Sequence, residues 1–98
     1  MYAHTNAAGC DETLKGNGED YRGCQSVTNL GYTCQNWVDQ RSHAHSLKLD
    51  EKGLGNHNHC RNPDDEITIW CYTTDPNKEW DYCGPISMYA CMFVYVCM

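Results

Sequence analysis

Cysteine is the residue in this chain with the most evident chemistry. The chain has 98 residues and eight cysteines. Cysteine at this density in a short chain is typical of an oxidised extracellular scaffold, in which disulfides make up for a thin hydrophobic core. Eight cysteines allow many pairings, and spacing alone does not choose among them. We therefore expect a small disulfide-rich fold whose crosslinks must be identified from other features.

Histidine offers a second chemistry. His43 and His45 are two residues apart, and so are His57 and His59, which directly precedes Cys60. Zinc ligands often have such spacings, so the two histidine pairs raise the hypothesis of a metal site.

Catalytic motifs are absent from the sequence. It has neither a Gly-x-Ser-x-Gly motif nor a glycine-rich phosphate loop, and its cysteines are expected to be crosslinked rather than nucleophilic. Asp64 and Glu66 are a carboxylate pair, but nothing else indicates a glycosidase. We predict that the chain is not an enzyme and needs no cofactor.

The charge balance narrows the class of partner. The chain has thirteen acidic and seven basic residues, which gives a net charge of −6. Because the basic residues are scattered, they form no stripe for nucleic acid or an anionic membrane. The most apolar stretch, 90–98, is too short to span a bilayer. We expect a cationic partner, no nucleic acid and no membrane insertion.

Turn residues dominate the chain. Clusters of glycine, asparagine and aspartate recur almost evenly and predict turns. No long window has a helical period, so we expect almost no helix. The segments that remain as candidate short strands are 31–37, 67–73, 79–83 and 92–96. We expect residues 1–9 to form a flexible leader and residues 10–98 to form one domain with a C-terminal extension.

Seven short sequence words resemble those of kringle domains in order and approximate spacing. The resemblance covers Cys10 to Cys91 and implies a kringle fold of short antiparallel strands and long loops. The words are Tyr21-Arg22-Gly23, Cys34-Gln35-Asn36-Trp37, His43-Ala44-His45, Gly53-Leu54, Cys60-Arg61-Asn62-Pro63-Asp64, Trp70-Cys71-Tyr72-Thr73-Thr74-Asp75-Pro76 and Trp80-Asp81-Tyr82-Cys83.

The resemblance also implies a disulfide pattern. Carried over residue by residue, it gives Cys34–Cys71 and Cys60–Cys83 as inner pairs and Cys10–Cys91 as the outer one. Cys24 and Cys97 have no place in the family pattern. Because two cysteines are then left over, we expect them to pair with each other. Cys10–Cys97 with Cys24–Cys91 is the alternative. With Cys60 in a disulfide, a zinc site loses its thiolate, so we expect neutral, hydrogen-bonded histidines and keep zinc binding as an alternative.

Many kringles bind lysine side chains in a shallow aromatic trough, and this resemblance implies a candidate binding site. Two carboxylates can hold an ammonium group, while aromatic faces pack on its methylene stem and attract the cation. Asp64 and Glu66, two residues apart, can point the same way if the segment is extended. Trp70, Tyr72 and Trp80 match the aromatic walls.

The cationic end of the trough departs from the family pattern. Glu79 stands where lysine-binding kringles commonly have arginine, and the other cationic position falls at about Leu47. Lys48 and Lys78, each one residue away, are candidates to substitute. Because Glu79 would repel a carboxylate, we expect an internal lysine or a simple amine to bind in preference to a C-terminal lysine.

Two functions therefore stay open. One is an extracellular module, secreted or on a cell surface, that belongs to a larger protein and docks a partner with exposed lysines or other cationic groups. The other is a kringle that docks a protein by another surface, or acts as a spacer, without binding lysine.

Overall fold

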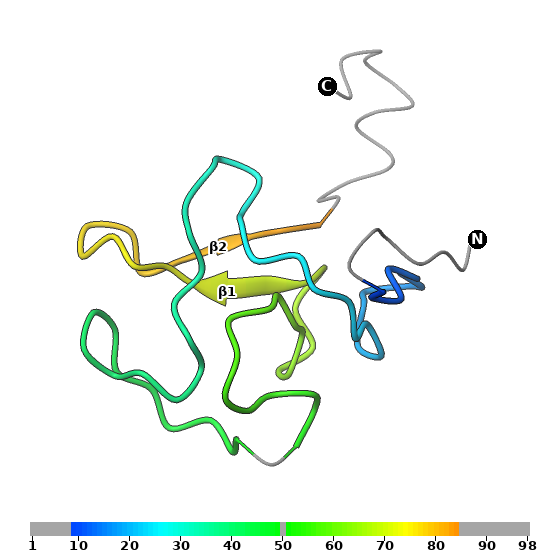
Figure 1. The fold of residues 1–98 in the computed structure, drawn as a ribbon, viewed down its shortest axis with the longest axis horizontal. Helices are drawn as coiled ribbons and strands as arrows, with labels where there is room; N and C mark the ends of the chain where they lie inside the picture. The colour runs from blue at the N-terminus through cyan, green and yellow to red at the C-terminus, as the bar shows by residue number, and fades with distance from the viewer. Residues whose placement is uncertain (1–8, 50, 85–98) are drawn as a thin grey trace.

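The computed structural model describes residues 9–49 and 51–84. Its regular structure is one small antiparallel sheet of two strands, β1 (Trp70–Tyr72) and β2 (Trp80–Tyr82). Long loops from the first two thirds of the chain wrap around this pair, and β1 lies near the middle of the molecule (Figure 1). No helix occurs in these two ranges, as the sequence predicted.

The hairpin β1–β2 has a register that places aromatic residues opposite one another. Trp70 pairs with Tyr82, and Tyr72 pairs with Trp80. Aromatic residues suit strands because they pack well on a pleated surface. The connecting turn is closed by Thr73, whose amide donates to the Glu79 carbonyl at 3.1 Å and whose hydroxyl donates to the Lys78 carbonyl. The turn thus sets the position of Glu79, directly before strand β2.

The segment 31–37, which we expected to be a strand, is not one. It contributes only isolated bridges, from Thr33 to Val27 and from Cys34 to Thr73. The chain turns just before it, where the Gly31 amide donates to the Thr28 carbonyl at 3.0 Å, and Gly31 has a φ of 92°. After this turn, Thr33 pairs with Val27 whereas Cys34 pairs with Thr73. Because successive residues pair with different segments, no continuous ladder forms.

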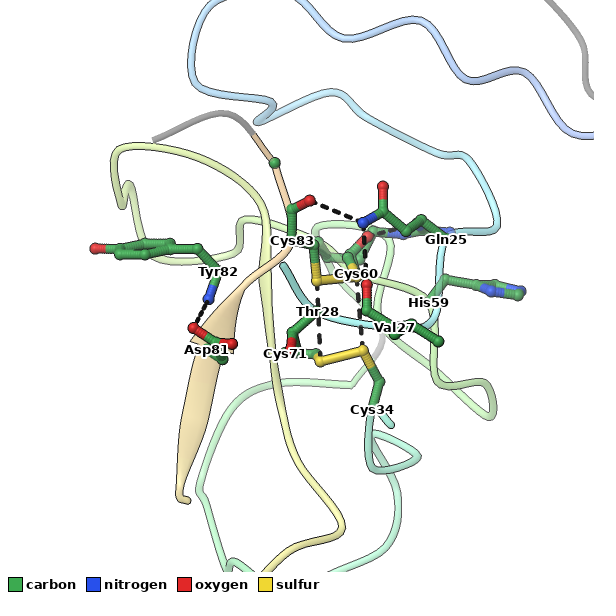
Figure 2. Close-up of a disulfide and its surroundings, with 12 residues drawn as sticks. Gln25, Val27, Thr28, Cys34, His59, Cys60, Cys71, Asp81, Tyr82 and Cys83 are labelled. Carbon is green, nitrogen blue, oxygen red and sulfur yellow. Dashed lines mark hydrogen bonds between the residues drawn. A yellow bond between two sulfur atoms is a disulfide. The ribbon is translucent and has the colours of Figure 1, made fainter. Parts of the chain in front are cut away.

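Two disulfides form the centre of the core. Cys34 is joined to Cys71 and Cys60 to Cys83, with Cα–Cα distances of 5.6 and 6.3 Å, which confirms the two inner pairs. Figure 2 shows the two bridges lying against each other, with the Cys34 and Cys60 sulfurs 3.6 Å apart. Trp37 and Ile69, each 1% exposed, are fully buried members of the same cluster. The crosslinks therefore occupy a position that aliphatic side chains fill in larger domains.

The third disulfide corrects our expectation for the N-terminal cysteine. Cys10 is joined to Cys24, with a Cα–Cα distance of 5.8 Å, so the predicted pairs Cys10–Cys91 and Cys24–Cys97 were wrong. Glu12 accounts for the proximity, because its carboxylate accepts hydrogen bonds from the Cys24 amide at 2.9 Å and from the Tyr21 hydroxyl. These contacts hold the segment around Cys10 against Cys24.

Several sequence predictions lie outside the described residues. They are residues 1–8 of the expected leader 1–9, the strand 92–96, and the positions of Cys91 and Cys97. Across 9–49 and 51–84, we find no helix with the length and apolarity needed to cross a membrane.

Candidate functional site

A small cleft of about 160 Å³ lies on the hairpin and the turn that precedes it. It brings together the two carboxylates and three aromatic residues singled out from the sequence, and it adds one further acid. The lining residues are Asp64, Glu66, Trp70, Tyr72, Glu79 and Trp80.

The aromatic walls come from both strands. Trp70 and Tyr72 are two apart on β1 and so lie on the same face, with ring centroids 5.0 Å apart. Trp80 on β2 packs edge-on against Trp70, with centroids 6.1 Å apart. Trp70 is 3% exposed whereas Trp80 is 38% exposed. Trp70 is therefore the base of the wall, and Trp80 is its accessible part.

The two predicted carboxylates are positioned by aromatic donors. The indole Nε1 of Trp70 donates to Asp64 Oδ1 at 3.0 Å, and the Tyr82 hydroxyl donates to Glu66 Oε1 at 2.8 Å. Each carboxylate keeps a second oxygen for which no hydrogen bond is found among the described residues. A pair of such oxygens in one cleft can accept from an ammonium group.

A turn, rather than an extended segment, places the carboxylates on the same side. Asp65, between them, has a φ of 65°, a left-handed conformation that aspartate tolerates better than most residues. The side chain of Asn62 closes the turn, since it accepts from the Glu66 amide and donates to the Glu66 carbonyl, both at 2.8 Å. Our expectation of an extended chain was wrong, although both acids do line the cleft.

The cleft has an anionic character. It is lined by three acidic residues and by no lysine, arginine or histidine of the described chain. The pKa of Tyr72 is raised by burial, and then by the charges of Glu79 and Asp64. The pKa of Tyr82 is raised first by its hydrogen bond to Glu66. Both tyrosines thus stay protonated and uncharged near neutral pH, and Tyr82 keeps its role as a donor to Glu66.

Lys48 and Lys78 do not line the cleft, contrary to our expectation that they would substitute for lost cations. Lys78 belongs to the turn before β2, and its ammonium lies 6.0 Å from the ring centroid of Tyr32. Lys48 borders another surface hollow, together with Leu47 and Lys52. The physical reason is that both lysines lie in loops outside the two strands, where the side chain of Lys78 approaches Tyr32 and that of Lys48 borders the other hollow.

The four histidines within residues 9–49 and 51–84 are engaged in structural hydrogen bonds. Each of the four uses a ring nitrogen to contact a backbone carbonyl: His43 with Asp75, His45 with Trp37, His57 with Gly53 and His59 with Cys24. Among the described residues, the clusters with enough ligand atoms for a metal consist of disulfide cysteines and Glu12, and none includes a histidine. These contacts disfavour the zinc alternative.

Sequence reasoning missed three residues that shape the cleft. Tyr82 holds Glu66, Asn62 holds the acidic turn, and the ring of His45 stacks on Tyr72 with centroids 5.0 Å and planes 4° apart. A signal existed for Tyr82, because it alternates with Trp80 on β2 and so faces the same side. The partner of His45 is distant in sequence and had no such signal.

Comparison with known families assigns the fold. The kringle domain family matches residues 13–91, which is most of the chain. The chain therefore belongs to the kringle family, a class of non-catalytic modules that generally bind proteins.

Two similar proteins extend this result. The chain is 47% identical over 79 residues to Cysteine repeat modular protein A of Toxoplasma gondii, a match that covers 81% of this chain and 2% of that protein. It is also 47% identical over 76 residues to Putative apolipoprotein(a)-like protein 2 of Homo sapiens, covering 74% of this chain and 57% of that protein. The chain thus spans only part of the relatives it matches. Kringles are modules of multidomain proteins, and kringles with disulfides are typical of extracellular proteins.

Proposed function

We propose that the cleft binds the ammonium group of a lysine side chain on a protein partner. The observation that carries this proposal is the convergence of Asp64, Glu66 and the exposed Trp80 in one cleft. The domain then acts as an extracellular docking module of a larger protein, whose other domains decide the biological context.

The chemistry divides between the two ends of a lysine side chain. The ammonium donates to the oxygens of Asp64 and Glu66 that are not engaged by Trp70 and Tyr82. Its methylene stem packs on Trp80, which removes apolar surface from water at about 25 cal/mol per Å². The ring of Trp80 adds a cation–π contribution of about 0.5–1 kcal/mol at such an exposed site.

Glu79 makes the cleft selective among amines. A free lysine analogue with a carboxylate at its far end would bring that carboxylate towards Glu79, and like charges repel. An internal lysine in a peptide has no such carboxylate. The domain should therefore prefer internal lysines, or simple alkylamines, over C-terminal lysines.

Titrations of the folded domain with hexylamine and with aminohexanoate, followed by tryptophan fluorescence, test this function. We expect a saturable change with hexylamine and weaker binding of the zwitterion. Tighter binding of aminohexanoate would contradict the role of Glu79.

A second candidate function rests on exposed apolar side chains outside the cleft. Leu30 is 72% exposed and Ile67 is 55% exposed. A partner could contact these residues without using a lysine. No fluorescence change up to high millimolar hexylamine would favour this second candidate over amine binding.

A further inference from the structure

The third carboxylate of the cleft stands at a different end from the other two. Glu66 is held by Tyr82, which pairs with Trp70 at one end of the hairpin ladder. Glu79 precedes Trp80, and its carbonyl accepts from Thr73 at the other end. Tyr82 is three positions after Glu79, a rise of roughly 10 Å along an extended chain. The cleft thus has an acidic group at each end and aromatic rings between them.

Glu79 has no ion-pair partner within 9–49 and 51–84. The one ion pair found there joins Arg41 to Asp39, at 2.9 Å, away from the cleft. Lys78, the neighbour of Glu79 in sequence, directs its ammonium to the ring of Tyr32. A single ammonium bound by Asp64 and Glu66 would leave the charge of Glu79 uncompensated.

We propose that the cleft recognises two cationic groups at once, one at Asp64 and Glu66 and the other at Glu79. This inference rests on the proposed amine binding and specifies its ligand. The ligand is a segment of a protein partner that presents two lysines close together. One lysine enters the acidic turn across Trp80, and the second neutralises Glu79 at the opposite end.

Aromatic surface between the acidic ends favours this ligand over a simple metal cation. The rings of Tyr72 and Trp80 present apolar surface where a metal ion would need oxygen ligands. Aliphatic chains between two ammonium groups match that surface. The shape of the cavity and the distribution of charge therefore indicate the same chemistry.

Three small probes of matched length test the inference. Hexylamine, cadaverine and aminohexanoate share an amine on a chain of five methylenes and differ only at the far end, which is a methyl, an ammonium or a carboxylate. Affinities are measured on the intact folded chain at low salt. Cadaverine can bind by either end, which alone raises its affinity about twofold over hexylamine. An electrostatic contribution of Glu79 must therefore appear as an advantage greater than twofold.

We expect cadaverine to bind roughly tenfold more tightly than hexylamine, since an exposed ion pair contributes up to about fivefold beyond the statistical factor. In Glu79→Gln the advantage should fall to about twofold while hexylamine binding persists. Glu19→Gln, an exposed site outside the cleft with the same change in charge, should keep the full advantage.

The outcomes separate the two proposals. Absence of hexylamine binding would overturn the amine-binding function itself. Hexylamine binding with no more than a twofold advantage for cadaverine in the wild-type protein would overturn only the two-cation inference. Capped peptides with one or two lysines identify the source of the cations: a preference for the two-lysine peptide is expected, and equal affinities would overturn the assignment to a protein segment.

Discussion

Replacement of Asp64 by asparagine isolates the charge of the acidic turn from its structure. The side chain of Asp64 is exposed, and its Oδ1 accepts from the Trp70 indole at 3.0 Å. Asparagine keeps an oxygen that can accept this hydrogen bond, so Asp64→Asn removes the negative charge and little else. The free energy of unfolding should therefore change by less than about 1 kcal/mol.

The expected loss of amine affinity lies between two limits. Exposed ion pairs contribute about 0.2–1 kcal/mol, whereas hydrogen bonds to charged groups contribute about 1.5–3 kcal/mol. The cleft has walls but is open to solvent, so we take a value of about 1.4 kcal/mol, which corresponds to a tenfold weaker affinity for hexylamine. Tryptophan fluorescence measures the affinity, and urea unfolding measures the stability.

Asp65→Asn provides a matched control. Asp65 is adjacent and exposed, does not line the cleft, and tolerates asparagine at its φ of 65°. Asparagine can also keep the hydrogen bond that Asp65 accepts from Asn17. Asp65→Asn should bind hexylamine nearly as well as the wild-type protein. Equal losses of hexylamine affinity in Asp64→Asn and Asp65→Asn would refute a direct contact between the amine and Asp64. Such a result would be explained by the change in net charge alone.

Four further predictions concern the walls, the core and the histidines. Trp80→Ala should weaken hexylamine binding at least several-fold with little loss of stability, because Trp80 is partly exposed. Trp37→Ala, in the buried core, should lower the free energy of unfolding by about 3–5 kcal/mol in urea titrations. A fully stable Trp37→Ala would contradict the core assignment. Replacing Cys34 and Cys71 together by alanine opens a loop of 37 residues and should cost about 4 kcal/mol, measured in the same way, and a loss below 1 kcal/mol would argue against a stabilising role for this bridge. Burial lowers the pKa of His57 and of His59 in the folded state, so the unfolded chain binds more protons. Stability should therefore fall as the pH drops through about 6.5 and level off below the folded pKa values. NMR titration of the two imidazoles checks this, and folded pKa values above about 6.5 would contradict it.

Features tied to sequence words could be predicted well. The words around Cys34, Cys60, Cys71 and Cys83 indicated the two inner disulfides, which the structure contains. Alternation along short strands placed Trp70 and Tyr72 on one face, where they line the cleft.

Features that depend on contacts between distant residues could not be predicted. The Cys10–Cys24 bridge depends on the hydrogen bonds of Glu12, and no local sequence pattern predicts these bonds. The acidic turn depends on the left-handed Asp65 and the closing contacts of Asn62. Lys48 and Lys78 were assigned to the cleft because they are adjacent in sequence to the lost cationic positions, but both lie in loops whose course the sequence does not determine.

NMR spectra of the indole N–H groups during a hexylamine titration test the central claim most directly. The chain has three tryptophans, and Trp37 is an internal control, because it is 1% exposed and its Nε1 donates to the His59 carbonyl at 2.7 Å. We expect saturable shifts of the Trp70 and Trp80 signals and a much smaller shift of the signal of Trp37, whose ring centroid lies 5.3 Å from that of Trp70. Unchanged Trp70 and Trp80 signals, or equal shifts of all three, would contradict amine binding in the cleft.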